Sequence, residues 1–403
     1  MRSKTVLISG AGVAGPTLAY WLNAAGFETT IVERAPRLRT GGYVIDFWGL
    51  GYDIAERMGL AAGLGSVGYH IREFRVVGGQ GQRLAGFGTK AFDALTGGRF
   101  ITLRRSDLSK LLLEAADSSS EVLFDDEIVS LREQTDSVRV QFRVAGERDF
   151  DLVVGADGLS SNVRTLAFGP QAQFEKRLGY SVAAFEVQGY RPRDKDVYVI
   201  HNEPGRMVGR VALRNDRTLF LFVFADDDPR PSPHDFATQR RILQATFGSA
   251  RWECAQILDR LDDVTELYFD RVSQIKMDKW SHGRVALVGD AAFCVSLLAG
   301  QGSALAMTAA YALGGELAKA DGDYHAAFRA YERLLRPFIA KKQKGAERFS
   351  AAFAPRTGWG LLLRNQVVKA CAIPAVARFA FSRDITDTLR LPDYVWPALE
   401  RIR

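Results

Sequence analysis

The alternation of apolar and polar positions predicts a β-α-β unit at the start of the chain. An apolar run at 6–9 stops at a glycine turn, which favours a buried parallel strand. The segment 13–25 is apolar at helical spacing and is followed by Gly26, which predicts a helix with a glycine C-cap. A second apolar run at 27–32 predicts the next strand, so the unit is complete within a short stretch of chain.

The middle of the chain changes from mixed elements to a strand-rich region. A helix is expected at 105–116, with Ser106 as its N-cap. Short strands are then expected at 122–124, 138–144 and 150–154. Further strand-like runs, separated by Gly, Pro and Asn-Asp turns, predict an antiparallel sheet that we assign to a second domain: 180–187, 197–201, 207–213 and 218–224.

In the last part of the chain the pattern predicts mainly helices. Helices are expected at 234–247 and 255–261, and strands at 264–275 and 285–288. Three further helices are then expected at 302–320, 324–353 and 361–371. Pro337 lies inside the second of these three and is expected to kink or divide it. Since no Pro-, Gly- or Ser-rich linker separates the regions, the domains should be joined by several crossings.

Composition narrows the class of protein. The chain has 403 residues, which is long for one core, with 47% hydrophobic and 25% charged residues, as in ordinary globular proteins. The net charge of +6 suits anionic nucleotides, but no strip of basic and aromatic residues and no known nucleic-acid-binding motif suggests that the protein binds nucleic acid.

The three cysteines are isolated, and we see neither a secretion signal nor an apolar stretch long enough for a membrane span. We therefore expect a cytoplasmic protein without a membrane anchor. The five histidines are far apart, so no metal site is expected.

A glycine turn carries the first chemical signal: Gly10, Ala11, Gly12, Val13, Ala14 and Gly15. In such a turn the first glycine permits the bend, the second lets backbone approach a pyrophosphate, and the third lets helix and strand pack closely. The N-terminus of the following helix offers free N–H groups to the phosphates. Glu33, at the end of the second strand, can accept hydrogen bonds from ribose hydroxyls. An acid at this place argues against a 2′-phosphate, so the turn favours FAD or NAD over NADP.

Two later motifs extend this site. A buried strand delivers Asp157 and Gly158 into a turn, with Arg164 shortly after, although Asp157 and Ser161 would also serve a purely structural helix cap. Another strand ends in Gly289 and Asp290, where the carboxylate suits a ribityl hydroxyl or, alternatively, an N-cap.

The segment Gly300-Gln301-Gly302 opens the next helix, and its N–H groups are expected to face the flavin ring and stabilise negative charge on it. Three motifs in this order indicate one extended FAD.

This set of motifs resembles the group A flavoprotein monooxygenases, the aromatic hydroxylases of the p-hydroxybenzoate hydroxylase type, over nearly the whole chain. Residues 268–294, 298–307 and 315–338 look most like the tetracycline-inactivating monooxygenases and related polyketide hydroxylases.

The resemblance implies an α/β fold in which a Rossmann-like FAD/NAD(P)-binding domain is interleaved with an antiparallel-sheet substrate domain, plus C-terminal helices. The expected FAD-binding domain comprises 1–73, 99–177 and 272–340. The expected substrate domain comprises 74–98 and 178–271, and the C-terminal helices 341–403.

The resemblance also implies roles for single residues. Glu33 and Arg34 would contact the adenosine side, and Arg104, in ITLRRSDL, would contact the flavin chain. Segment 41–49 would line the flavin ring, with Asp46 as its one charge.

In such enzymes NADPH or NADH reduces FAD, and oxygen then adds at the flavin C4a to give a hydroperoxide. That species hydroxylates an aromatic or enol carbon in a water-free site. The implied substrate is a polycyclic aromatic or polyketide-type molecule, tetracyclines included. We expect a monomer or weak dimer.

The strands of the second domain offer the candidate substrate contacts. Phe220, Phe222 and Phe224 alternate on one strand and would form an apolar wall, or alternatively a core against a helix. Met207 and Arg210 lie on the neighbouring strand. A C-terminal helix around 359–366 would close the substrate entrance, or simply pack on the FAD domain.

The sequence departs from the wider family at two positions. Phe293 and Leu297 stand where His and Pro are frequent, which puts proline-assisted phenol deprotonation in doubt. Two other functions stay open from the residues alone: an oxygen-independent flavin reductase or dehydrogenase, and a non-catalytic flavoprotein that sequesters a drug.

Overall fold

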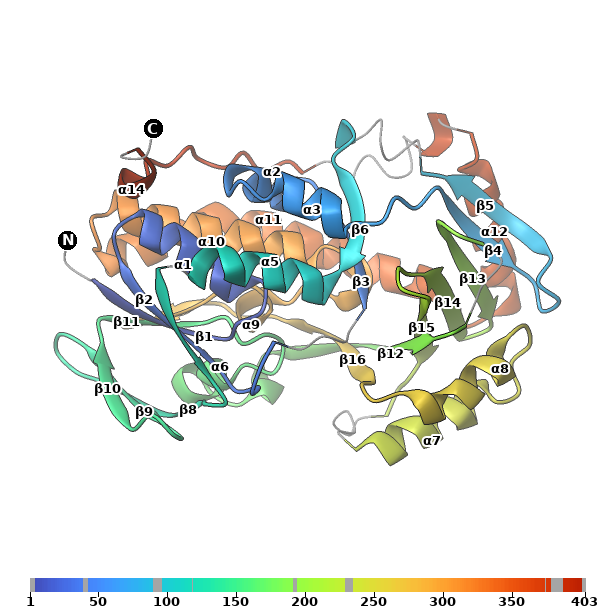
Figure 1. Cartoon of the computed structure of the whole chain (residues 1–403), viewed down its shortest axis with the longest axis horizontal. Helices are drawn as coiled ribbons and strands as arrows, with labels where there is room; N and C mark the ends of the chain where they lie inside the picture. Colours follow the sequence, from blue (N-terminus) through green and yellow to red (C-terminus); the bar gives the residue numbers. More distant parts are fainter. Residues whose placement is uncertain are drawn as a thin grey trace.

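A computed structural model describes residues 4–38, 43–89, 96–117, 119–190, 194–228, 235–373, 375–377 and 387–400. Figure 1 shows two lobes, one with helices stacked on a sheet near the N-terminus and one built around a larger sheet. Strands of the two lobes alternate along the chain, and the α/β architecture expected from the sequence is confirmed.

The sheet of the first lobe has six strands in the order β17-β18-β11-β1-β2-β7. Five of them run parallel: β1 (Thr5–Ser9), β2 (Glu28–Glu33), β7 (Ser120–Phe124), β11 (Leu152–Gly155) and β18 (Val285–Leu287). The short β17 (Ser281–His282) is antiparallel to β18. The central strands are continuously apolar because both faces of a parallel sheet are covered.

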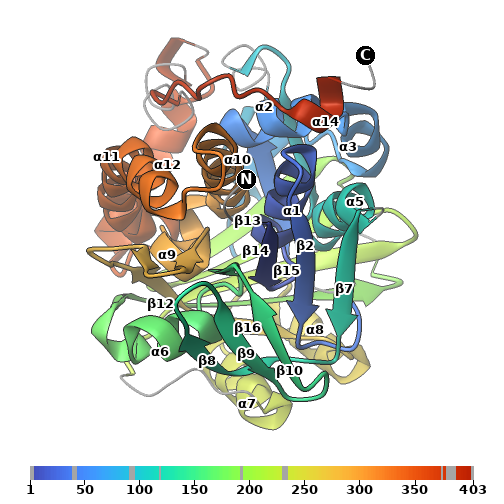
Figure 2. The same cartoon turned by 90° about the vertical axis from the view of Figure 1, so that its left-hand side faces the viewer.

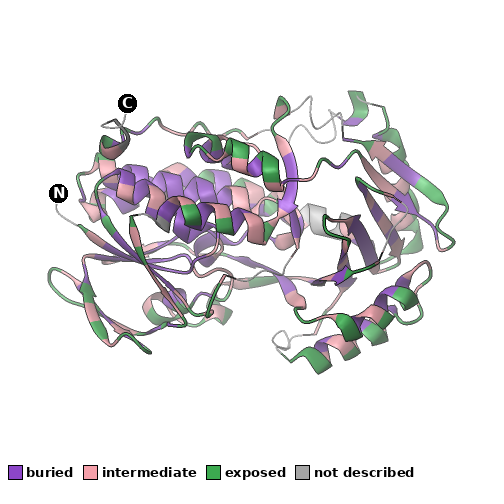
Figure 3. Cartoon of the chain, in the orientation of Figure 1, coloured by how far each residue is buried: buried purple, intermediate pink, exposed green. Residues whose placement is uncertain are grey.

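Helices cover one face of this sheet and a small sheet covers the other (Figure 2). The helices are α1 (Ala14–Ala24), α5 (Arg105–Asp117) and α10 (Gly302–Lys319). The small sheet is formed by β8 (Ile128–Glu133), β9 (Val138–Phe142) and β10 (Glu147–Phe150). Helix α10 is buried continuously from Leu305 to Leu317 (Figure 3), which explains why its sequence is apolar on all sides.

The sheet of the second lobe has seven strands in the order β16-β12-β15-β14-β13-β4-β5. Their bounds are β4 (Glu73–Val77), β5 (Arg83–Gly88), β12 (Glu175–Gln188), β13 (Val197–Glu203), β14 (Arg206–Ala212), β15 (Arg217–Ala225) and β16 (Tyr268–Ile275). The pairing is antiparallel except between β13 and β4. Helices α7 (Phe236–Phe247) and α8 (Cys254–Asp259) and the 3-10 turn η2 (Arg260–Asp263) cover one face.

The remaining elements connect or cover the lobes. A two-stranded ribbon of β3 (Val44–Trp48) and β6 (Phe100–Arg104) lies between them. The helices are α2 (Leu50–Arg57), α3 (Ala61–Val67), α6 (Asn162–Phe168), α9 (Asp290–Phe293), α11 (Tyr324–Phe353), α12 (Gly358–Ala370) and α14 (Pro397–Glu400), with 3-10 turns η1 (Gln171–Gln173) and η3 (Leu297–Ala299).

Two local expectations are wrong and one is narrowed. Of the two effects expected of Pro337, a kink or a division, the division is absent, because α11 runs through this residue. The strand expected at 150–154 is two strands in different sheets, β10 and β11, because Asp151 turns between them and binds Lys4 and Thr5. Ser106 lies inside α5 instead of capping it. In the described part of the chain, no helix combines the length and apolar character needed to cross a membrane.

Candidate functional site

The glycine turn joins β1 to α1, and each glycine has a different reason to be there. Gly10 has a φ of 108°, and a Cβ on it would lie 2.7 Å from the carbonyl oxygen of Ala156. A Cβ on Gly15 would lie only 2.0 Å from the carbonyl oxygen of Gly10. A Cβ on Gly12 would meet nothing closer than Nη2 of Arg105, at 3.6 Å. Two glycines are therefore required by packing, whereas a side chain at Gly12 would make only an ordinary contact, so a ligand beside Arg105 can approach the backbone there.

Glu33 ends β2 beside this turn. Its carboxylate accepts hydrogen bonds of 3.0 Å from the backbone N–H groups of Ala11 and Ala35. Val13 and Ala14, the next residues of the turn, are buried at the start of α1. Arg34, expected beside the adenosine, is exposed at the end of the strand. The structure thus joins Glu33 to the glycine turn and leaves Arg34 at the surface.

The Gly289-Asp290 motif lies at the same, N-terminal end of α1 as the glycine turn. A Cβ on Gly289, whose φ is 62°, would lie 3.3 Å from the Cβ atoms of Ala14 and Ala306, so α1 and α10 converge there. The Asp290 carboxylate faces Gly302, the first residue of α10. Desolvation raises the pKa of Asp290, and the charge of Arg105 partly opposes that rise.

Arg105, and not Arg104, is the arginine of this site. Desolvation by the surrounding protein acts to lower the pKa of Arg105. The nearby acidic groups of Tyr43 and Asp290 have the larger combined effect, so the pKa of Arg105 is raised. Arg104, the last residue of β6, instead forms an ion pair of 3.0 Å with Glu186. The reason is local: Arg104 still follows the strand, whereas Arg105 begins α5 and turns toward the glycine turn.

Asp157 fills the structural role that the sequence left open. Its carboxylate accepts from Ser161 Oγ at 2.5 Å and from the backbone N–H groups of Asn162 and Val163 at 2.8 and 3.0 Å. It therefore stabilises the first turn of α6. Its contribution to a cofactor site is to fix the β11–α6 turn next to Gly10, since a Cβ on Gly10 would lie 3.0 Å from the Cα of Asp157.

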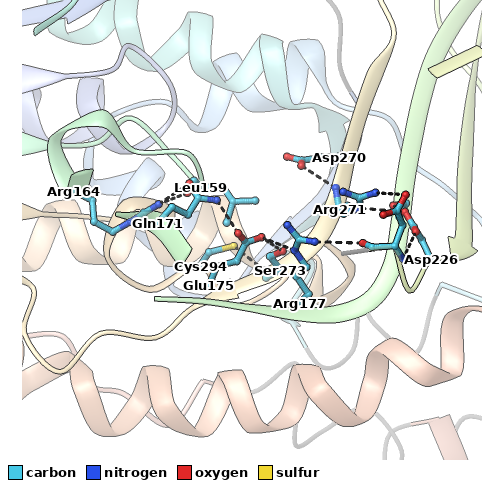
Figure 4. Close-up of polar contacts among 12 residues, drawn as sticks. Leu159, Arg164, Gln171, Glu175, Arg177, Asp226, Asp270, Arg271, Ser273 and Cys294 are labelled. Atoms are coloured by element: carbon cyan, nitrogen blue, oxygen red, sulfur yellow. Dashed lines mark hydrogen bonds and ion pairs between the residues drawn. The ribbon is translucent and has the colours of Figure 1, made fainter. Parts of the chain in front are cut away.

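Arg164 connects this motif to the next one. The side chain is fully buried and donates to the carbonyl oxygens of Ala291 (2.9 Å) and Leu159 (2.6 Å). Gln171 accepts a further bond from Arg164 and donates to Glu175 at the start of β12. Figure 4 shows these contacts beside a second polar group, in which Arg271 binds Asp226 at 3.3 Å. The polar contacts tie the first lobe to the long strands of the second.

A cavity of about 950 Å³ opens between the two lobes. One face of the seven-stranded sheet forms its floor. The wall toward the first lobe is formed by Asp46 and Trp48 of β3 together with Gly300 and Gln301. Gly300 has a φ of 66° and lies close to the ring of Trp48. Of the residues expected around the flavin ring, Asp46, Gly300 and Gln301 line this cavity, and Gly302 follows them as the first residue of α10.

Asp46 is the only acidic residue among the described residues that line the cavity. It accepts a hydrogen bond of 2.5 Å from Thr102 Oγ1. Burial raises the pKa of Asp46 to about 6, and the hydrogen bond only partly opposes the rise. The carboxyl group can therefore change its protonation state near neutral pH.

Of the two alternatives left open for the phenylalanines, the structure shows the core against helices and not the apolar cavity wall. Phe220, Phe222 and Phe224 are fully or almost fully buried against Phe247 and other residues of α7 and α8. The alternate residues of the same strand, Leu219 and Leu221, line the cavity. Both faces of β15 are apolar, so the alternation was real but the face was misassigned.

The two candidate substrate residues on β14, Met207 and Arg210, also lie on opposite faces of the sheet. Met207 lines the cavity, as expected. Arg210 points to the other face, where it binds Glu253 and Asp194 and lies over the ring of Trp252. Sequence analysis also missed the cavity residues Phe74, Phe87 and Tyr198. It predicted a strand at 197–201 but none over β4 and β5, and it did not show which face of the sheet is turned to the cavity.

The first lobe has the features that FAD requires. The open side of Gly12, the N-terminus of α1 and the Arg105 guanidinium suit a diphosphate, and Glu33 and Asp290 suit the hydroxyl groups on either side of it. The N-terminus of α10 at Gly302 lies at the cavity end of this path.

Comparison with known proteins agrees with this site. Residues 3–322 match a family model described as an FAD binding domain. An uncharacterized protein of Mycobacterium tuberculosis is 43% identical over 345 residues, which cover 84% of this chain and 92% of the relative. A protein named flavin-dependent monooxygenase, from an unknown prokaryotic organism, is 32% identical over 396 residues, covering 96% and 98%.

Among solved structures, tetracycline destructase Tet(55) is 30% identical and superposes with a TM-score of 0.83, covering 98% of this chain and 99% of that one. Sequence, fold and site geometry together show that the chain belongs to the class A flavin monooxygenase family and is an FAD-dependent monooxygenase.

Proposed function

We propose that the enzyme consumes NADPH or NADH and hydroxylates a polycyclic aromatic or polyketide-type small molecule in the cavity between the lobes. The observation that supports this most is the cavity itself. It is large, mainly apolar, and ends at Asp46, Gly300 and Gln301, beside the N-terminus of α10. Tetracyclines are the first substrate class to test, because Tet(55) has a similar fold throughout its length.

The chain's own groups have separable tasks in this proposal. Bound FAD supplies the redox chemistry that activates oxygen. The N–H groups at the start of α10 would stabilise negative charge on the flavin ring. Leu219, Leu221 and Met207 exclude water from the reacting carbon. Asp46 would hold or release a proton next to the ring, where its raised pKa of about 6 suits an acid–base role.

The test is coupled turnover by the FAD-loaded enzyme. NADPH or NADH oxidation is followed with tetracyclines, anthracyclines and simple phenols, and the products are weighed by mass spectrometry. We expect one added oxygen atom on members of one polycyclic class. A flavin reductase would instead oxidise NAD(P)H without oxygen transfer, and a sequestering protein would bind the ligand with negligible NAD(P)H oxidation.

A cavity variant gives the matched control. Leu221→Trp adds bulk on the cavity face of β15 and is expected to stop oxygen transfer while FAD binding stays intact. If no aromatic compound is oxygenated by the wild-type enzyme under any condition, the proposed function is wrong.

A further inference from the structure

Helix α12 carries an apolar surface on its outer side. The helix packs on β5 and β13 of the seven-stranded sheet (Figure 1), yet each of its residues is at least partly exposed. Trp359 is 83% exposed and Leu363 is 69% exposed. A set of exposed positions recurs at spacings of three and four residues, which places them on one side of the helix. All of them except Gln366 are apolar: Trp359, Leu362, Leu363, Gln366, Val367, Ala370 and Ile373.

Large exposed apolar side chains are concentrated in this part of the molecule. In the described part of the chain, half of them lie between residues 359 and 376, and Leu84 of the neighbouring strand β5 adds another. Single exposed apolar side chains are normal on a protein surface, whereas a cluster of them marks a site of interaction. The apolar face of α12 is therefore a docking surface that needs an occupant.

The cavity between the lobes opens beside this face. A residue that lines the cavity and is also exposed belongs to the rim of its mouth. On α12 that residue is Val367, and on α11 such residues are Pro337, Ala340, Lys341 and Lys344. The mouth therefore lies between the apolar helix α12 and a side of α11 that carries two lysines.

The charges around the apolar face are positive. The segment 357–373 contains no acidic residue, and its exposed Lys369 lies at the margin of the apolar face. Lys341 and Lys344 add two exposed cations on the other side of the cavity mouth. A helix with Trp and Leu on one side and cations at its margin is typical of helices that lie in the surface of a membrane with anionic lipids.

A second copy of this chain fits the surface less well. A helix of 13 residues is about 20 Å long, and with a width of about 10 Å it offers a contact strip of roughly 200 Å². A stable protein interface buries about 800 Å² on each partner. In a pair of copies joined through α12, the segment 357–373 would also offer no acidic residue to bind Lys369 of the other copy.

We propose that the apolar face of α12 docks on the surface of an anionic lipid membrane. Trp359, Leu362 and Leu363 would enter the boundary between headgroups and acyl chains, and Lys369 would stay at the level of the headgroups. The helix is too short to cross a hydrocarbon core of about 30 Å, so it would lie in the plane of the membrane surface. The cavity mouth would then face the lipid, from which an apolar substrate can enter; this consequence rests on the function proposed above.

The experiment measures binding of the FAD-loaded full chain to lipid vesicles by co-sedimentation. The vesicles consist of phosphatidylcholine, with or without phosphatidylglycerol. Wild-type enzyme should bind the anionic vesicles, should bind pure phosphatidylcholine clearly less, and should be released from the anionic vesicles by high salt. The double variant Trp359→Ser/Leu363→Ser should lower the partition coefficient at least about tenfold, because two apolar side chains no longer leave water.

Val144→Ser is the matched control, because Val144 is 68% exposed but lies between β9 and β10 in the other lobe. It should bind anionic vesicles as wild type does. Thermal unfolding of both variants should match wild type, since the replaced side chains are exposed.

Three results with vesicles would overturn the proposal: no binding to anionic vesicles, equal binding to pure phosphatidylcholine, or a loss in Val144→Ser as large as in the double variant. Light scattering adds a fourth, a wild-type dimer that becomes a monomer in the double variant, because a second copy would then cover the face. Vesicle binding needs no NAD(P)H and no substrate, so these outcomes are distinct from failure of the monooxygenase assay.

Discussion

Two alanine substitutions in the glycine turn should affect different properties. Gly15→Ala should destabilise the fold, whereas Gly12→Ala should weaken FAD binding and leave the stability of the fold unchanged. In Gly15→Ala the new Cβ would lie 2.0 Å from the Gly10 carbonyl oxygen and 3.3 Å from Cγ2 of Ile8. Overpacking of this kind costs about 1–3 kcal/mol, and with rigid backbone on one side we expect the upper end. Better helix propensity of alanine returns at most about 1 kcal/mol. The net loss of stability should be about 2 kcal/mol.

In Gly12→Ala the nearest atom to the new Cβ is Nη2 of Arg105, at 3.6 Å, which is an ordinary contact. The fold should therefore keep its stability to within about 0.5 kcal/mol. The methyl group would, however, occupy the space where a pyrophosphate approaches the backbone. We expect FAD affinity to fall at least tenfold, equivalent to about 1.4 kcal/mol.

The assay has two parts, urea unfolding of the FAD-free protein and flavin-fluorescence titration with FAD. Wild-type FAD affinity in Gly12→Ala would refute the assignment of the open side of the turn to the cofactor. Wild-type stability in Gly15→Ala would refute the packing argument.

Three further predictions concern other parts of the molecule. Arg164→Met should lower the free energy of unfolding by about 3 kcal/mol or more, because the carbonyl oxygens of Ala291 and Leu159 lose their buried donors; urea unfolding checks this, and a loss below about 1 kcal/mol would contradict it. The pKa of Asp46 in the folded protein is about 6, above the ordinary value near 4, so its contribution to stability is present at low pH and is lost as pH rises through 6. Asp46→Asn should therefore gain about 1 kcal/mol relative to wild type between pH 5 and pH 8 in thermal unfolding of the FAD-free protein, and a pH-independent difference would count against the burial argument. Phe222→Ala should cost about 3–5 kcal/mol of stability, whereas its neighbour Leu221→Ala should mainly change the KM for an aromatic substrate; the reverse pattern would show that the faces of β15 are assigned wrongly.

Local patterns predicted the first lobe well because its signals are short in range. The strand, glycine turn and helix from Thr5 to Ala24 follow from apolar runs and glycine placement. Glu33 and Asp290 could be located because Glu33 ends the buried strand β2 and Asp290 comes shortly after the buried strand β18.

The predictions that were wrong concerned the direction in which a side chain points, and local sequence patterns specify that direction poorly. Arg104 and Arg105 are neighbours, and only the exact end of β6 decides which of them faces the glycine turn. On β15, Phe222 and Leu221 are both apolar, and only the position of α7 decides which side is core. The cavity itself is assembled from strands far apart in the chain, so no single segment indicates its lining.

The strand order of the first lobe has a consequence for protein synthesis. β18 pairs with β11 and contributes residues 285–287, so every strand of the seven-stranded sheet, from β4 to β16, leaves the ribosome before the parallel sheet can be completed. Until then β11 is an unpaired edge strand, and the exposed edges of two nascent chains can pair with each other. Asp290 and α10 emerge later still. A growing chain therefore cannot complete its flavin site until about three quarters of it has been made, and FAD should stabilise only nearly complete polypeptides.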